Sequence, residues 1–175
     1  MLRRIRCLPR ILTLAAAFLL AVSSSAMAQS ERRGASFDLF GAYVRLIDTS
    51  PGDDADTEAY GLRGGYRFTN VWAVEASLSK LNEDVDLFFG DLSLKAYVLH
   101  ADRFEVYALA GPGKFRVEEG TFRADEDTAH AGIGAEIRLG ERAVVRPEVR
   151  GRWFTDELKF DDGIVDYSLG VGWRF

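Results

Sequence analysis

Apolar and polar residues alternate with a period of two along most of this chain, and the alternation is clearest at its C-terminus. Every second residue from Val165 to Phe175 is apolar, whereas the residues between them are small or charged. Successive side chains of a strand point to opposite faces, so this segment predicts a strand with one apolar face. A helix would need apolar residues three and four positions apart.

The same alternation recurs upstream and predicts an all-β fold. Five further segments place apolar or small residues at every second position: 60–68, 72–79, 91–98, 130–139 and 145–153. The segments 36–46 and 104–117 are also strand-like, which brings the expected number of strands to eight. The facing of 36–46 stays open. For the other segment we take Phe104, Val106, Ala108 and Ala110 as the outer face.

The connections between these segments alternate in length. Short turns are expected at Thr69-Asn70, Ala101-Asp102 and 140–142, and longer, acid-rich loops at 47–57, 82–86, 119–127 and 156–162. Short turns at one rim and long loops at the other are typical of an eight-stranded antiparallel up-and-down transmembrane β-barrel. In this arrangement the loops 47–57, 119–127 and 156–162 would lie outside the cell.

The residues of the other face decide between a membrane barrel and a soluble one. That face holds charged residues in mid-strand together with glycines at 61, 65, 132, 134, 170 and 172. Glycine would only weaken a strand facing water, whereas in a narrow interior it makes room for long charged side chains. The pattern therefore predicts apolar side chains against lipid and charged ones inside. Pro147 lacks a ladder donor, so a bulge or kink is expected there.

The first 28 residues predict a secretory signal peptide. A basic start is followed by the apolar run Ile11–Val22 and by the small-residue site Ala26-Met27-Ala28. This order is typical of a signal peptide cleaved after Ala28, and the run is too short for a transmembrane helix. Residues 29–175 would form the barrel, exported through the periplasm. The single cysteine, Cys7, would leave with the signal.

Charge argues against a nucleic-acid partner. Four of the 22 Lys and Arg residues precede position 29, so the remaining chain carries 18 basic against 27 acidic residues, a net charge of -9. A nucleic-acid-binding protein needs a basic face that displaces counterions from phosphate.

The inward face predicts a network of paired charges. Six residues are expected near mid-height: Arg63, Glu75, Lys95, Glu136, Glu148 and Arg150. Further inward charges are expected at Arg67, Asp91, Glu105, Arg138, Arg146, Arg152, Asp166 and Arg174. Eight strands enclose space that side chains fill, and an orphan buried charge costs on the order of 3–5 kcal/mol, so these groups should pair. A gated path for small ions is the alternative.

The C-terminal strand resembles that of the small outer-membrane β-barrel family, which includes the OmpA barrel domain and OmpX. The resemblance covers residues 29–175 and is most specific in the segment 167–175, which ends on an aromatic residue. It implies an assembly signal formed by Tyr167, Leu169, Val171, Trp173 and Phe175. The implied partners are the barrel-assembly machinery, periplasmic chaperones and outer-membrane lipids including lipopolysaccharide. The implied protein is a monomer of the outer membrane.

Catalytic and metal chemistry have weak support. Some small outer-membrane barrels modify lipid A and need a histidine near a serine and an acid at the outer rim. His130 is the one plausible base, expected at the start of the sixth strand, since His100 falls at a turn of the opposite rim. The His-x-Ser arrangement is absent, and the acidic clusters 53–56 and 125–127 lack EF-hand spacing. We therefore expect no catalysis, metal or cofactor, and a structural or surface-interaction role. A lipid A-modifying enzyme or a narrow small-ion pore is the alternative.

Overall fold

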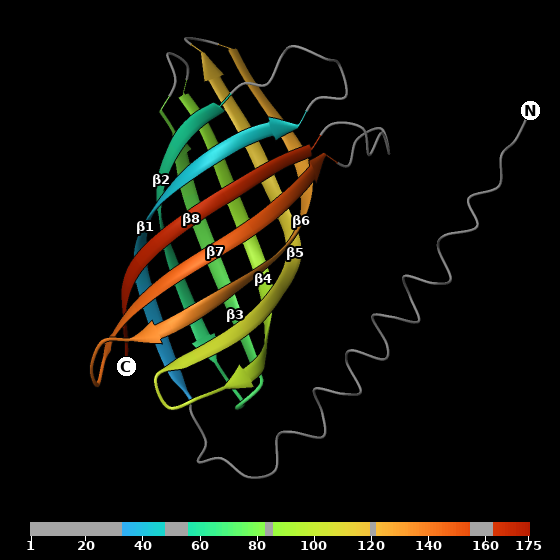
Figure 1. Ribbon diagram of the computed structural model, residues 1–175. Helices are drawn as coiled ribbons and strands as arrows, with labels where there is room; N and C mark the ends of the chain where they lie inside the picture. The colour runs from blue at the N-terminus through green and yellow to red at the C-terminus, as the bar shows by residue number, and fades with distance from the viewer. Residues whose placement is uncertain (1–32, 48–55, 83–85, 120–121, 155–162) are drawn as a thin grey trace, which may run out of the picture.

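Eight antiparallel strands close into one barrel in a computed structural model that describes residues 33–47, 56–82, 86–119, 122–154 and 163–175 (Figure 1). The strands are β1 (Gly34–Ile47), β2 (Asp56–Arg67), β3 (Trp72–Leu81), β4 (Asp86–His100), β5 (Phe104–Glu119), β6 (Phe122–Arg138), β7 (Ala143–Phe154) and β8 (Gly163–Arg174). Each strand pairs with the next along the chain, which confirms the predicted up-and-down barrel. No helix in the described part of the chain is long and apolar enough to cross a membrane.

Pairing between β1 and β8 closes the ring. Their register runs from Ser36 opposite Arg174 to Ile47 opposite Gly163. Lipid offers no hydrogen bonds to an open sheet edge, so a closed ring is what allows strands to cross a membrane. The three short turns and Phe175 lie at one end, here called the turn end, which is lower in Figure 1; the opposite end is the loop end.

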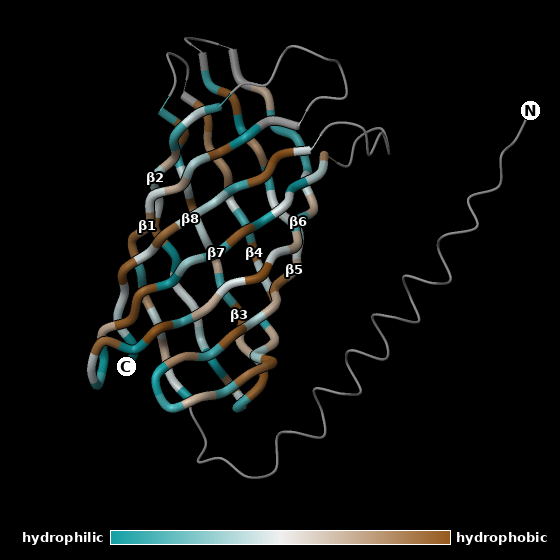
Figure 2. The backbone as a smooth tube through the Cα atoms, viewed as in Figure 1, coloured by the Kyte–Doolittle hydropathy of each residue, from teal (hydrophilic) through white to brown (hydrophobic). Residues whose placement is uncertain are grey.

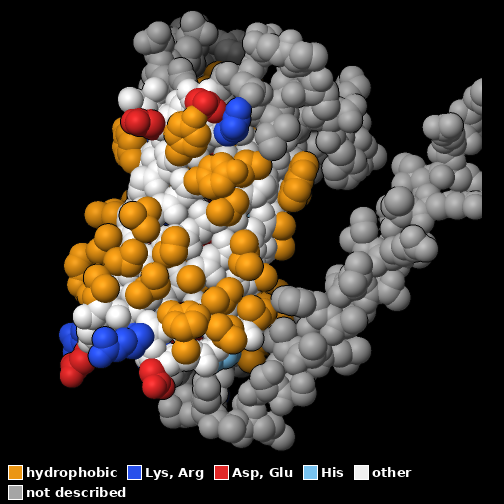
Figure 3. Space-filling model, in the orientation of Figure 1, with side chains coloured by type: hydrophobic (Ala, Val, Ile, Leu, Met, Phe, Trp, Pro, Cys, Tyr) orange, Lys and Arg blue, Asp and Glu red, His pale blue; other side chains and the backbone are white. Residues whose placement is uncertain are grey.

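Apolar side chains cover the outside of the barrel, and charged ones fill the inside. On β8, Leu169 is 58% exposed whereas Asp166 is 7% exposed. The alternation of hydropathy can be followed along each strand in Figure 2, and Figure 3 shows apolar side chains gathered over the middle of the visible face. The facing of β1 is now settled, because Leu39 points outward and Asp38 is buried. In β5 the chosen outer face is correct, with Phe104 exposed and Tyr107 buried.

Two strands run further than the sequence indicates. Most of the segment 119–127 belongs to strands and not to the predicted loop: β5 ends at Glu119 and β6 begins at Phe122. Outward cross-strand ion pairs support the extension, with Arg116 Nε 2.7 Å from Asp125 Oδ1 and Lys114 Nζ 3.4 Å from Asp127 Oδ1. Opposite charges facing each other across a ladder stabilise it, whereas the acids alone suggested a loop.

The expected irregularity at Pro147 takes a different form. Paired positions of β6 and β7 step from Gly134–Glu148 to Ile137–Val145 without a change of register, so the ladder skips the proline but no bulge forms. The register shift lies instead in β4, between Tyr97 and Leu99. A proline removes one donor without adding a residue, whereas a bulge needs an extra residue in one strand.

Candidate functional site

The six residues predicted at mid-height lie inside the barrel, all buried, in two connected groups. In one group Lys95 Nζ lies 3.2 Å from Glu75 Oε2 and 3.1 Å from Glu136 Oε1. In the other, Glu148 pairs with Arg63 Nη1 at 3.3 Å and with Arg150 Nη2 at 2.8 Å. These groups come from β2, β3, β4, β6 and β7, so the pairs tie together strands that are not neighbours.

Arg146 joins the two groups, although the sequence analysis placed it only among the further inward charges. Its Nη2 lies 2.7 Å from Glu75 Oε2 and 3.9 Å from Glu148 Oε2. It also forms a close ion pair with Asp38, which itself lies 3.8 Å from Arg63 Nε. Sequence reasoning missed Asp38 because the facing of its strand was open, and extending the period-two alternation outward from Leu39 would have found it.

Two buried tyrosines complete the mid-height network and were not predicted as part of it. The Tyr97 hydroxyl donates to Glu136 Oε1, and the Tyr107 hydroxyl donates to Glu148 Oε2, each at 2.7 Å. Lys95 Nζ lies 3.8 Å from the centre of the Tyr107 ring, which is a cation–π distance. Each tyrosine thus supplies a hydrogen bond to one carboxylate and a π face to a cation.

A second charged layer lies toward the loop end. Asp91 accepts from Arg152 Nη1 at 2.5 Å and from Arg150 Nη1 at 2.7 Å, and Arg152 Nε donates to Asp166 at 2.7 Å. Beyond this layer the inward side chains become apolar. That apolar cluster consists of Val44, Ala59, Leu81, Phe89 and Ile164, with Ala42, Leu87, Phe115 and Phe154 packed against it. The sequence analysis assigned only small and charged residues to the interior and did not expect this cluster.

His130 belongs to this second layer and not to the outer rim. Because β6 begins at Phe122, His130 lies well inside the strand, and its side chain is fully buried. A hydrogen bond of 2.8 Å joins His130 Nε2 to Ser93 Oγ, and His130 Nδ1 lies 3.7 Å from Asp91 Oδ1. The serine is 37 residues away from the histidine, so no short motif reveals the contact.

A third charged layer lies at the turn end around Glu105. Arg67 Nη1 donates to both oxygens of Glu105, at 3.0 and 3.1 Å, and Arg174 Nη1 donates at 2.8 Å. Arg138 Nη2 lies 3.9 Å from the same carboxylate. His100 ends β4 beside it, with Nε2 at 3.6 Å from Glu105 Oε1. Three guanidinium groups therefore share this single carboxylate.

The remaining predicted sites fall on the surface or outside the described residues. Ala26, Ala28, 53–55 and 156–162 lie outside them. Asp125 and Asp127 belong to β6 and pair with β5, and within the described segments no group of three or more His, Cys, Asp or Glu could hold a metal ion. The proposed assembly-signal residues all lie exposed on the outer face of β8 or just after it: Tyr167, Leu169, Val171, Trp173 and Phe175.

Solved structures share this fold. The N-terminal β-barrel domain of Pseudomonas aeruginosa OprF aligns with a TM-score of 0.63 and 17% identity, covering 82% of this chain and 100% of that one. The attachment invasion locus protein Ail of Yersinia pestis aligns at 0.60 and 18%, covering 81% and 99%. Neisserial surface protein A aligns at 0.62 and 14%, covering 84% and 100%.

Sequence comparison identifies the family. No curated protein matches the chain significantly. The family model described as outer membrane protein beta-barrel domain matches residues 14–175, which is most of the chain. The fold, the lipid-facing apolar surface and this match agree, and the protein is therefore a member of the outer-membrane β-barrel family, located in the outer membrane.

Proposed function

We propose that this protein is a structural and surface-interacting barrel whose interior is plugged by its own charged side chains. The observation that carries the proposal is the stacking of three ion-paired layers, around Glu105, Arg146 and Asp91, beneath the apolar cluster of the loop end. An eight-stranded barrel has little interior space beyond its side chains. The paired charges of this barrel occupy the middle of that space and hold opposite walls together.

Single-channel recording in planar bilayers tests the plug. The expected result is a quiet membrane after insertion, because a hydrated ion would have to displace several paired charges and then cross an apolar layer. A double variant, Arg150→Ala with Glu148→Ala, removes the ion pair between them and also their pairs with Asp91 and Arg63, so it should raise the frequency of brief openings. Sustained conductance steps from the unaltered protein would instead establish the small-ion pore.

The surface role rests on the three acidic segments that the sequence analysis expects outside the cell. The ranges 47–57, 119–127 and 156–162 contain twelve acidic and two basic residues. A structure of Ail holds the heparin analogue sucrose octasulfate, which is a polyanion. The acidic segments of this chain would repel such a ligand, so its surface partner is a basic one. Adhesion to basic and to acidic coated surfaces, compared between a deletion strain and its complemented form, tests this; equal adhesion of the two strains would exclude the role.

Assembly partners follow from β8. The exposed aromatic and aliphatic residues of its outer face are proposed to be recognised by the barrel-assembly machinery after delivery by periplasmic chaperones, with the signal segment 1–28 removed on export. The finished barrel is a monomer whose apolar outer face contacts outer-membrane lipids, including lipopolysaccharide.

A hydrolase is the second candidate, and one observation favours it: Ser93, His130 and Asp91 lie in the order of a nucleophile, a base and an acid. Two features oppose it. The histidine is fully buried, and Asp91 is engaged by Arg150 and Arg152. Labelling with a fluorophosphonate, together with the lipid A profile of a His130→Ala strain, distinguishes a hydrolase from a structural barrel. We expect no labelling and an unchanged profile, whereas labelling lost in Ser93→Ala would establish catalysis.

A further inference from the structure

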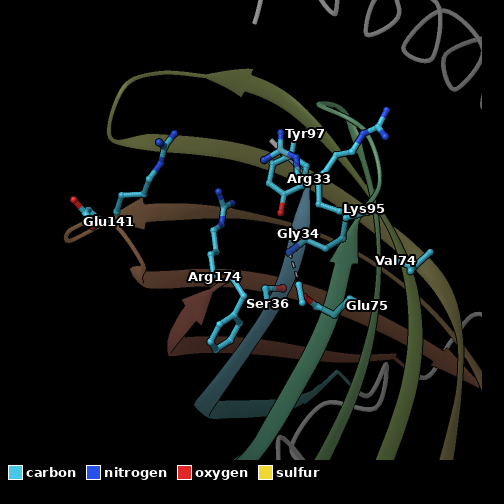
Figure 4. Close-up of a pocket in the computed structure, with 14 residues that line it drawn as sticks. Arg33, Gly34, Ser36, Val74, Glu75, Lys95, Tyr97, Glu141 and Arg174 are labelled. Carbon is cyan, nitrogen blue, oxygen red and sulfur yellow. Dashed lines mark hydrogen bonds and ion pairs between the residues drawn. The ribbon is translucent and has the colours of Figure 1, made fainter. Parts of the chain in front are cut away.

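A cavity of about 170 Å³ lies at the turn end of the barrel (Figure 4). One of its walls is made of small residues, Gly34, Ser36 and Ala73, from β1 and β3. Long side chains of β4 and β2 also line the cavity, and Figure 4 shows Lys95 extended toward Glu75. A space of this size holds on the order of five water molecules, at ~30 Å³ each.

The charges around this cavity are out of balance. Arg67, Arg138 and Arg174 line it and share Glu105. Glu136 also pairs with Arg174, but it is shared with Lys95. Of the acids that line the cavity, Glu75 is committed to Lys95 and Arg146, and Glu141 stands at the rim. Arg67, Arg138 and Arg174 therefore outnumber the two carboxylates, those of Glu105 and Glu136, with which they pair.

Arg138 has donors left over. Among the described residues its buried Nε has no hydrogen-bond partner, and its Nη2 reaches only the Ala101 carbonyl, at 3.5 Å, and Glu105, at 3.9 Å. An unpaired buried donor of a charged group is costly, so a ligand with free oxygens would be stabilised here. We propose that this cavity binds a phosphate group, held by Arg138.

Phosphate chemistry suits this position for two reasons. A guanidinium group presents a planar fork of donors that matches phosphate oxygens, and a tetrahedral phosphate can accept from several such groups at once. In addition, the aromatic residues Phe68, Trp173 and Phe175 are exposed at the turn end, which places this end at the level of lipid headgroups. The phosphate can therefore come from a lipid headgroup or from free phosphate.

Titration of inorganic phosphate into the intact barrel, held in a phosphate-free maltoside detergent, tests the site. Amide NMR shifts should saturate and be confined to the turn end. Arg138→Gln should weaken binding at least about tenfold, because it removes a charge-assisted hydrogen bond to the phosphate. Arg142→Gln, which removes the same charge from an exposed turn position at this rim, should bind as the unaltered protein does.

A second variant guards against simple misfolding. Ala73→Leu fills the cavity and keeps every charge, so it should also abolish binding while the barrel stays folded, as judged by resistance to unfolding in detergent. Shifts that never saturate, or equal losses in Arg138→Gln and Arg142→Gln, would overturn the proposal and reduce the effect to surface charge.

Vesicle composition then distinguishes the source of the phosphate. If a headgroup occupies the cavity, vesicles of phosphatidylglycerol should weaken the apparent affinity for inorganic phosphate at least about tenfold relative to vesicles of an uncharged galactolipid. Equal affinity in the two vesicles would assign the site to free phosphate. Absence of saturable binding in both vesicles would contradict the site altogether.

Discussion

At the scale of single residues, Arg146 holds the interior together. Its guanidinium group pairs with Asp38 and Glu75 and lies within 4 Å of Glu136 and Glu148. These carboxylates come from β1, β3, β6 and β7, so one side chain spans the barrel. Four negative charges placed so close together are tolerable only because cations stand between them, and Arg146 is the one that contacts all four.

Arg146→Met should therefore destabilise the barrel strongly. It keeps most of the side-chain volume but takes a close cation away from buried Asp38 and Glu75, and removing one partner of a buried pair costs about 3–5 kcal/mol. Urea titration in lipid vesicles, followed by tryptophan fluorescence, measures this free energy of unfolding. The same substitution at exposed Arg142 should stay within about 0.5 kcal/mol. Equal losses of unfolding free energy in the two variants would show that the buried ion pairs stabilise the barrel no more than an exposed arginine does.

Gly134 is needed because the Tyr107 ring passes over it. A Cβ atom at position 134 would lie 2.6 Å from Tyr107 Cζ, well inside van der Waals contact. Gly134→Ala should thus cost about 1–3 kcal/mol, as other overpacking substitutions do, and weaken the hydrogen bond from Tyr107 to Glu148. Gly64→Ala is the control, since a Cβ there meets nothing within 4 Å. Urea titration of the two variants checks the difference.

At the scale of elements, each strand has two faces in different surroundings. β8 presents Asp166 to the interior network and Tyr167, Leu169 and Val171 to lipid. The β5–β6 hairpin does the same along most of its length and then continues with exposed pairs of opposite charge. The exposed pairs contribute far less per contact than the buried ones, because water screens them.

Removal of Phe175 should separate assembly in cells from folding in the test tube. Phe175 is the most exposed large apolar residue that the structure describes, at 73%, so its loss should change the unfolding free energy little. Insertion into the outer membrane should fall several-fold if this residue belongs to the assembly signal. Leu139→Ala, an outward residue of the same rim at 66% exposure, is the control for lost apolar surface. Membrane fractionation with refolding in detergent provides both readouts, and normal insertion would contradict the role.

At the scale of the whole molecule, the two ends of the interior differ. The loop end is closed by packed apolar side chains, including Phe89 and Phe115 with ring centres 4.8 Å apart. The turn end holds the cavity. Water and small solutes should therefore reach the interior from one end only.

Cysteine labelling tests this asymmetry. The single natural cysteine, Cys7, lies in the predicted signal segment, so an introduced cysteine would be unique after cleavage. Ser36→Cys, in the cavity, should react quickly with a charged maleimide, whereas Ser93→Cys, beneath the apolar cluster, should react at least about a hundredfold more slowly. Both should react alike in denaturant. Similar rates in the folded barrel would show that the interior is open.

Much of the fold follows from the local pattern. Each residue of a strand that lies between lipid and a narrow interior faces one or the other, and apolar residues suit the lipid whereas charged residues suit the interior. The alternation around Arg63, Lys95 and Glu136 was enough to place them inside. The extent of β6 could not be predicted from the local pattern. Asp125 and Asp127 are typical of a loop, and only the structure shows that Arg116 and Lys114 lie opposite them.

The candidate site, too, could be predicted only in part from the sequence. The amino-acid sequence alone determined which side chains of most strands face lipid and which face inward, because a period of two assigns each residue to a face. The facing of β1 and the inward apolar cluster at the loop end came only from the structure. Only the tertiary structure decided which inward groups meet. The contact of Ser93 with His130 and the sharing of Glu105 by three arginines depend on the tilt and register of strands across the ring. Register is a property of pairs of strands, and closure adds a constraint that no single strand carries.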